Sequence, residues 1–137
     1  MVPIPKEVMD LLKPGEEQMQ VVKVLATSDE KGVPHAIILG SLMAIDEETL
    51  AFALVWAGTT RKNLETTKEA CVIVYKPPMT AYRIHGCFEE YISSGPLFDR
   101  YVEELKKFNL ECRGVIKIKV AEIYTAGPPN PGQKLTC

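Results

Sequence analysis

A short stretch of polar and basic side chains has the composition of an anion-binding site: Thr59-Thr60-Arg61-Lys62-Asn63. It follows a strand-like apolar run, and its pattern predicts a short helix over residues 59–67. Backbone N–H groups at the start of a helix favour an anion. Arg61 can bind a phosphate through two parallel hydrogen bonds, and Lys62 adds a point charge. The stretch therefore predicts a monophosphate site.

Several of these residues allow a second interpretation. The stretch also fits a surface helix that Thr59 or Thr60 caps, with both cations in water. Trp56, the sole tryptophan, is either a core anchor or the border of a flat ring attached to the same phosphate. Arg83, inside an apolar run, is either an outward-facing strand charge or a cation that reaches a shared pocket. The residues alone leave these alternatives open.

No other pattern predicts protein-based catalysis. The chain contains no G-x-G-x-x-G, no P-loop and no G-x-S-x-G, so three common nucleotide and hydrolase signatures are missing. We interpret His35 and His85 as structural or surface residues, and Gly86 as a bulge or a close backbone approach. We therefore predict no catalytic residue. The spacing of the four cysteines suits no metal, so we predict no metal site either. Cys71 and Cys87 are expected in the core and Cys137 is expected to be exposed; the fourth cysteine is Cys112.

Length and charge limit the class of protein. The 137 residues suit a single domain over residues 1–137. A net charge of −2 argues against nucleic-acid and anionic-membrane partners, which need a basic surface. The start has no secretory pattern, the apolar runs are too short to span a bilayer, and reduced cysteines are typical of the cytoplasm, so we expect a cytoplasmic protein.

The elements that must position the phosphate site are mostly strands. Six are predicted, at 19–28, 33–45, 49–55, 70–76, 81–92 and 115–120, with a tight turn at Asp29-Glu30-Lys31-Gly32. A first helix begins at Pro5 and ends at Pro14-Gly15. A later helix begins near Ser94-Gly95-Pro96, and its predicted apolar face comprises Leu97, Phe98, Tyr101, Val102, Leu105 and Phe108. Tight turns between successive strands favour an antiparallel barrel.

Five segments, taken in order, resemble the FMN-binding split barrels related to pyridoxamine 5'-phosphate oxidase. They are V-L-A-T-S-D-E-K-G-V-P-H (24–35), T-T-R-K-N-L (59–64), Y-R-I-H-G-C-F-E (82–89), S-S-G-P (93–96) and A-G-P-P-N-P-G-Q-K-L (126–135). The resemblance covers about residues 19–135. It implies a mainly β fold, a six-stranded antiparallel split β-barrel of Greek-key type with a few short helices. It also implies a homodimer with one FMN at each end of the interface. The short chain favours a second subunit as well, because 137 residues are few for burying a ring system and a ribityl phosphate.

The resemblance also implies which residues contact FMN. The strand from His35 through Ile38 to Ser41 would line the isoalloxazine ring, largely through backbone groups. Val55 and Trp56 would flank the ring. Arg83 would reach the flavin across the subunit interface. The phosphate and ribityl chain would be held by Thr60, Arg61, Lys62 and Asn63.

Departures from the family narrow the expected activity. Pyridoxamine phosphate oxidases carry a C-terminal Arg-x-His segment that grips the substrate phosphate, whereas this chain has no histidine after His85 and no arginine after Arg113. We therefore expect no oxidation of pyridoxamine phosphate, and instead an FMN-dependent oxidoreductase with an unidentified small redox substrate. Two alternatives are a protein that holds FMN without a substrate, and a split barrel that binds haem or a deazaflavin.

Overall fold

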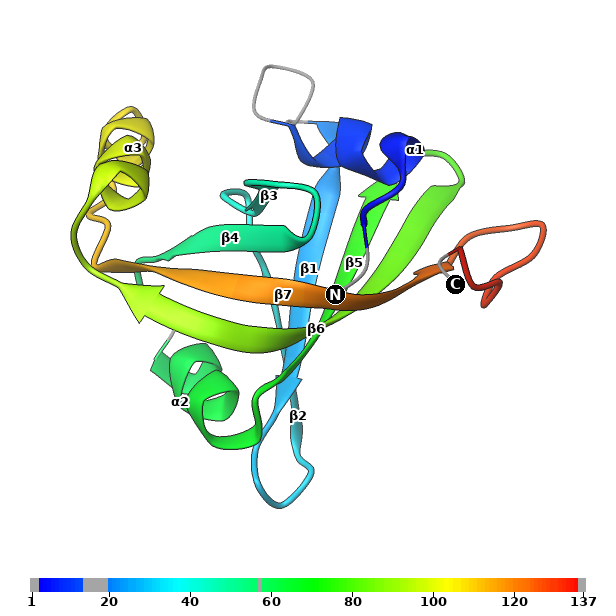
Figure 1. Cartoon of the computed structure of the whole chain (residues 1–137), viewed down its shortest axis with the longest axis horizontal. Coiled ribbons are helices and arrows are strands. Elements are labelled where there is room, and N and C mark those ends of the chain that lie inside the picture. Colours follow the sequence, from blue (N-terminus) through cyan, green and yellow to red (C-terminus); the bar gives the residue numbers. More distant parts are fainter. Residues whose placement is uncertain (1–2, 14–19, 57, 136–137) are drawn as a thin grey trace.

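Seven antiparallel strands form one curled sheet in the computed structural model, which describes residues 3–13, 20–56 and 58–135 (Figure 1). Their order across the sheet is β2-β1-β5-β6-β7-β4-β3. The strands are β1 Val22–Ser28, β2 Pro34–Ile38, β3 Met43–Ala44, β4 Thr49–Leu54, β5 Glu69–Lys76, β6 Thr80–Ile92 and β7 Gly114–Thr125. The mainly β antiparallel split barrel is confirmed, with one strand more than expected.

The additional strand arises where a single long strand was expected over residues 33–45. The chain forms β2, turns at residues 39–42, and then forms β3. β2 pairs with β1 and β3 pairs with β4, so the two strands lie at opposite edges of the sheet. The chain turns here because it must cross from one edge to the other. The strand expected from Met19 begins at Val22, and Met19 itself lies outside the described residues.

Local signals correctly predicted the turn between β1 and β2. The carboxylate of Asp29 accepts hydrogen bonds from the backbone N–H groups of Lys31 and Val33, both at 2.9 Å. Gly32 has a φ of +85°, a conformation that side chains disfavour. This turn places β2 antiparallel to β1 with His35 opposite Thr27.

Helices cover parts of the sheet. They are α1 Lys6–Met9, continued by a 3₁₀ turn η1 Asp10–Leu12, then α2 Gly58–Thr67 and α3 Pro96–Lys106. Val8 and Leu12 are buried in the barrel core, whereas the predicted helix end at Pro14-Gly15 lies outside the described residues. Phe108 was predicted on the apolar face of α3, but it follows the helix and is exposed.

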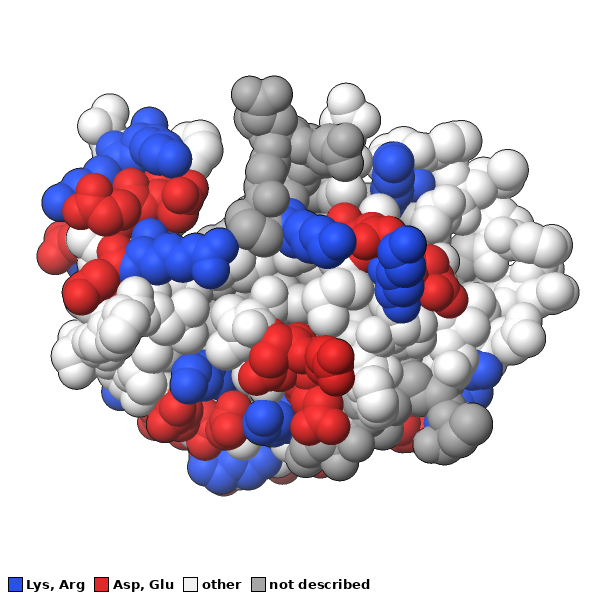
Figure 2. Space-filling view, turned by 45° about the horizontal axis from the view of Figure 1, so that its top comes forward, with Lys and Arg blue, Asp and Glu red and all other residues white. Residues whose placement is uncertain are grey.

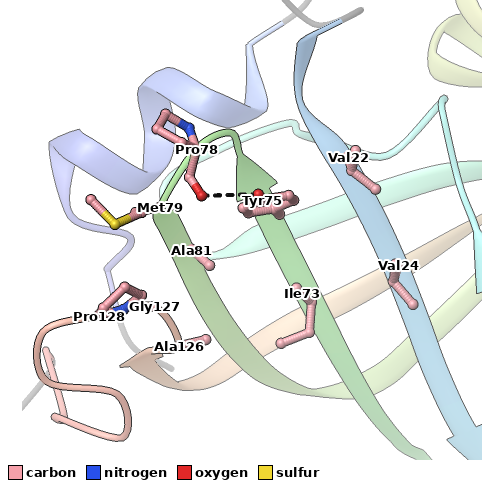
Figure 3. Close-up of a pocket in the computed structure, with 10 residues that line it drawn as sticks. All are labelled: Val22, Val24, Ile73, Tyr75, Pro78, Met79, Ala81, Ala126, Gly127 and Pro128. Carbon is pink, nitrogen blue, oxygen red and sulfur yellow. Dashed lines mark hydrogen bonds between the residues drawn. The ribbon is translucent and has the colours of Figure 1, made fainter.

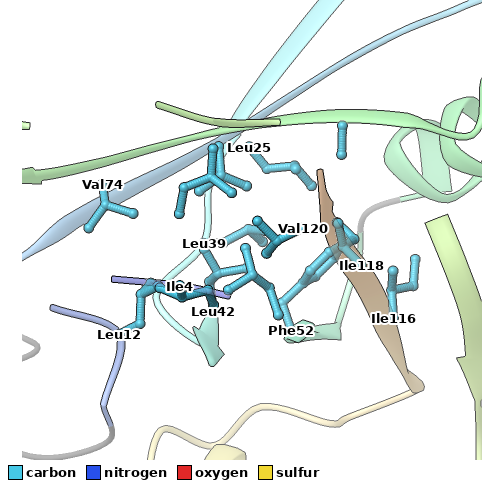
Figure 4. Close-up of a cluster of buried hydrophobic side chains, with 14 of the residues drawn as sticks. Ile4, Leu12, Leu25, Leu39, Leu42, Phe52, Val74, Ile116, Ile118 and Val120 are labelled. Atoms are coloured by element: carbon cyan, nitrogen blue, oxygen red, sulfur yellow. The ribbon is translucent and has the colours of Figure 1, made fainter. Parts of the chain in front are cut away.

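Two buried clusters divide the core. The larger one fills the barrel, where Leu39 and Leu42 from the turn after β2 lie beside Ile4 (Figure 4). The smaller one joins α3, through Tyr101 and Leu105, to β4 and β7. Gly86 marks a bulge between β6 and β7, and a Cβ there would lie 2.5 Å from Ile118 Cγ2. The predicted close backbone approach at this glycine is therefore confirmed.

No helix in the described part of the chain is long and apolar enough to cross a bilayer.

Candidate functional site

The first turn of α2 holds a buried polar group that has no partner. Thr60 is 0% exposed, and within the described residues its hydroxyl makes no hydrogen bond. Thr59 in the same turn is exposed. Since α2 begins at Gly58, both threonines lie inside the helix, and neither caps it as the alternative interpretation required. An unpaired buried hydroxyl costs free energy, which a ligand that hydrogen-bonds to it would recover.

Asn63 connects this helix to the barrel. Its side chain is 4% exposed, and Nδ2 donates a 3.1 Å hydrogen bond to Oγ1 of Thr27 on β1. His35 lies opposite Thr27 in the β1–β2 ladder, so both side chains are on the same face of the sheet. The structure thus brings together three separate parts of the chain, α2, β1 and β2, beside the predicted phosphate site.

The guanidinium of Arg61 already has partners. Nε lies 2.7 Å from Oε1 of Glu65, and the guanidinium carbon is 3.7 Å from the centre of the Tyr91 ring. The hydrogen bond that Arg61 donates to Glu65 raises the pKa of Arg61 above its ordinary value. Glu65 occupies only Nε, so the Nη groups of Arg61 can still donate to an anion, although the carboxylate offsets part of the local positive charge.

Lys62 is one of the residues that line a polar hollow. The hollow has a volume of about 280 Å³ between α2 and the β1–β2 turn, and its lining comprises Asp29, Glu30, Lys31, Lys62, Asn63 and Thr66. Two carboxylates and two ammonium groups balance in charge there. The side chain of Lys62 is exposed, so it can turn toward a neighbouring anion at little cost.

The segment predicted to line the isoalloxazine ring as one strand, residues 35–41, is a strand only as far as Ile38. Ile38 ends β2 with 75% of its surface exposed, whereas Ser41 lies in the following turn. Oγ of Ser41 accepts a hydrogen bond from the N–H of Ala53 at 3.0 Å, and its carbonyl accepts one from the hydroxyl of Tyr101 at 3.0 Å. Ile38 therefore presents an apolar side chain directly before a turn that other elements hold in place.

Trp56 follows β4 and is 78% exposed, so the interpretation as a core anchor is wrong. Val55 beside it is half-buried against the α3 cluster. An exposed indole next to the first turn of α2 leaves a flat apolar surface available to a ligand.

Arg83 lies on the outer face of β6, because its neighbour Ile84 points into the core. Nε of Arg83 donates a 2.9 Å hydrogen bond to Nε2 of His85, and the guanidinium lies 4.6 Å from the centre of the Tyr124 ring. The hydroxyl of Tyr124 donates to Glu122 at 2.6 Å, which lowers the pKa of Glu122 and raises that of Tyr124. Within one chain, Arg83 therefore belongs to a separate polar network on the outer face, away from the Thr27 face.

A family model for pyridoxamine 5'-phosphate oxidase matches residues 5–127 of the chain. The chain belongs to this family. No functionally curated protein matches it.

Solved structures share the fold of this chain. HupZ from Group A Streptococcus has a TM-score of 0.77 at 22% identity, over 94% of this chain and 98% of that one. An FMN-binding protein from Syntrophomonas wolfei has a TM-score of 0.77 at 17% identity, over 91% and 90% of the two chains. An F420 reductase has a TM-score of 0.67 at 17% identity, over 88% and 98%. At these identities the likeness concerns the fold alone.

One feature of this family member was missed by sequence reasoning, an apolar groove of about 370 Å³ on the outer face of the sheet (Figure 3). Its lining comprises Val22, Val24, Ile73, Tyr75, Pro78, Met79, Ala81, Ala126, Gly127 and Pro128. The side of the molecule with the C-terminal loop is largely uncharged, whereas acidic and basic groups are mixed elsewhere (Figure 2). The signal was present in β1 and β5, whose apolar residues occupy both faces of the strand, a pattern typical of strands covered on both sides.

The cysteines differ from the expectation for a core. Cys71 and Cys87 are half-buried free thiols, whereas Cys112 is buried and Cys137 lies outside the described residues. Burial raises the pKa of Cys71, so its thiol is a weak nucleophile. Among the described residues, no group of three or more potential ligands could hold a metal ion.

Proposed function

We propose that this protein binds FMN, with the phosphate at the first turn of α2, and uses it as an oxidoreductase. The observation that carries the proposal is the hydroxyl of Thr60, which is buried without a hydrogen-bond partner among the described residues. A phosphate oxygen at this turn would accept a hydrogen bond from that hydroxyl and from backbone N–H groups of α2. The residues present therefore fit the group.

The surrounding side chains have separate roles in this proposal. Arg61 would donate to the phosphate through its Nη groups, which Glu65 leaves available, and Lys62 would add a second positive charge. Asn63 keeps α2 against β1 and so holds the anion site beside the barrel. Ile38 and Trp56 would exclude water from the ring. When bound, FMN supplies the hydride or electron transfer, so no protein acid or base is required.

The variant Thr60→Val tests the phosphate assignment. Valine has nearly the shape of threonine, so the variant removes the hydroxyl and should keep the fold. We expect FMN affinity to fall about tenfold, because one hydrogen bond to a charged group is lost. Thr59→Val, in the same turn but exposed, is the matched control and should bind FMN as the wild type does. Equal affinity of Thr60→Val and wild type, in a fluorescence titration, would refute the assignment.

A double variant, Arg61→Ala with Lys62→Ala, tests the charges. It should lose FMN during purification while circular dichroism remains unchanged, because both side chains are exposed. Retention of FMN at the wild-type level would contradict the proposed role of the two cations.

We further propose a homodimer that closes the site. Its support is the apolar outer face, where the groove and the exposed side chains of Val22 and Met79 lie. Arg83 on that face would then reach the partner's flavin. Ile73→Glu should yield monomers in size-exclusion chromatography with light scattering, whereas Val33→Glu, an exposed apolar residue in the β1–β2 turn, should stay dimeric. A dimeric Ile73→Glu variant would exclude this face as the interface.

Two alternatives have specific tests. The structural likeness to an F420 reductase favours a deazaflavin as the second candidate. The absorption spectrum of the purified protein distinguishes FMN, a deazaflavin and haem. Steady-state turnover with NAD(P)H and a dye then separates an oxidoreductase from a protein that only holds FMN. The cytoplasmic location stays a prediction from the sequence.

A further inference from the structure

The two edges of the sheet are linked by a single turn. β2 and β3 are the outermost strands at opposite ends of the sheet order, yet only residues 39–42 separate them along the chain. No ladder pairs β2 with β3 among the described strands. The pairing of β2 with β3 therefore cannot position the turn, and its contacts with β1, β4 and α3 must hold it.

Lys23 on β1 contacts both ends of this turn. Its carbonyl oxygen accepts a 2.9 Å hydrogen bond from the N–H of Leu39. Its side chain runs through the core, and Nζ donates a 2.8 Å hydrogen bond to the carbonyl oxygen of Leu42. Lys23 thus links both ends of the turn, Leu39 and Leu42, to β1.

Tyr101 on α3 holds the middle of the same turn. Its hydroxyl lies 3.0 Å from the carbonyl oxygen of Ser41 and 2.8 Å from that of Ala51 on β4. The turn is therefore fixed between two side chains, one from β1 and one from α3.

A lysine at this place is costly for the fold. Its side chain is 2% exposed and packs within the barrel, where Val74 is its neighbour across the ladder. Within the described residues it forms no ion pair, and desolvation by burial lowers its pKa to about 8. An unbranched apolar side chain would fill the space without this penalty. A contribution to stability therefore does not explain why a lysine occupies this position. Its hydrogen bond to the carbonyl oxygen of Leu42, which fixes the shape of the turn, does.

We propose that Lys23 is a positioning residue for the cofactor site, because it fixes the turn that follows Ile38 and contains Ser41 against the ring of the bound flavin. This inference rests on the proposed function. Lys23 acts through the carbonyl oxygen of Leu42 and does not itself contact the flavin. Tyr101 supports the same turn from the opposite side.

The test compares Lys23→Met with wild type in two measurements. Hydrogen–deuterium exchange of the flavin-free protein should show faster exchange confined to residues 39–43. FMN titration should show an affinity about tenfold lower, although the variant is at least as stable in urea. Greater stability with weaker binding is a combination that a merely structural role does not produce.

Two further variants complete the design. Lys119→Met is the matched control, since Lys119 donates to Oγ1 of Thr49 and should leave FMN affinity unchanged. Tyr101→Phe removes only a hydroxyl and should loosen the same turn, so it tests independently whether the position of the turn controls FMN affinity.

The outcomes are distinct. Unchanged exchange at residues 39–43, or unchanged FMN affinity in both turn variants, overturns the positioning role. A parallel loss of stability and affinity in Lys23→Met also overturns it. Absence of FMN binding by the wild type refutes the proposed function instead, and the exchange measurement still shows whether Lys23 holds the turn.

Discussion

The ammonium group of Lys23 donates a 2.8 Å hydrogen bond to the carbonyl oxygen of Leu42 from inside the barrel core. The two residues are 19 positions apart, and the bond joins β1 to the turn before β3. Its charge has no ion-pair partner among the described residues, so the protonation of one side chain affects the stability of the whole fold.

Relative to Lys23→Met, the stability of the wild type should therefore rise with pH in the alkaline range. The comparison cancels the effect of Tyr101 and Cys71, whose pKa values burial raises and which act in the opposite direction. Burial lowers the pKa of folded Lys23 to about 8 from an ordinary value of 10.5, so between these values the unfolded chain holds more protons. The contribution of Lys23 to the free energy of unfolding should increase across this window, by up to ~3 kcal/mol. Below pH 8 the ammonium group is charged in the folded protein, and the full cost of burying that charge remains. Urea denaturation at several pH values measures this. In Lys23→Met this contribution should be absent and stability at pH 7 higher; a wild-type curve identical to that of the variant would contradict the explanation.

The hydrogen bond between Asn63 and Thr27 should hold α2 on the barrel. Asn63→Ala leaves the Thr27 hydroxyl buried without its partner, which should cost about 1–2 kcal/mol in urea denaturation. Thr27→Val should cost a similar amount. Because both variants break the same bond, the double variant should be less destabilised than the two single effects added together. Strict additivity would show that the two side chains are not coupled.

Releasing Arg61 from its carboxylate should favour anion binding. Glu65→Gln removes the partner 2.7 Å away and should strengthen FMN binding about threefold at low salt, with the gain lost at high salt. The free energy of unfolding should change by less than about 0.5 kcal/mol, because the pair is exposed. Glu103→Gln, which breaks an exposed pair on α3, serves as the control. Weaker binding by Glu65→Gln would mean that the carboxylate orients Arg61 for the phosphate.

Gly86 should tolerate no side chain. A Cβ would meet Ile118 Cγ2 at 2.5 Å and the backbone oxygen of Lys119 at 2.7 Å, so Gly86→Ala should lower stability by about 1–3 kcal/mol. Gly40 has nothing within 4 Å of such a Cβ, and Gly40→Ala should be nearly neutral in the same thermal unfolding measurement. Equal stability of the two variants would show that the β6–β7 backbone moves apart at low cost.

Local patterns in the sequence were sufficient for much of the fold. The strand predicted over residues 115–120 lies within β7, where the alternating residues Ile116, Ile118 and Val120 are all buried. The Asp29–Gly32 turn was predicted because its hydrogen bonds and its positive φ depend on neighbouring residues. The start of a helix at residues 59–63 was also predicted, because it depends on neighbouring residues. The burial of the Thr60 hydroxyl without a partner among the described residues was not predicted.

By itself, the sequence determined most of the strands, the tight turn after β1 and the concentration of positive charge at Arg61 and Lys62, because these depend on residue types a few positions apart. Only the tertiary structure decided that residues 33–45 divide into two strands, that Arg61 lies against Tyr91, and that Trp56 is exposed. The contacts that hold the candidate site join residues such as Tyr101 and Ser41, which are 60 positions apart. Contacts of this kind form only when the sheet closes, and no local pattern specifies where a curled sheet brings its two edges together.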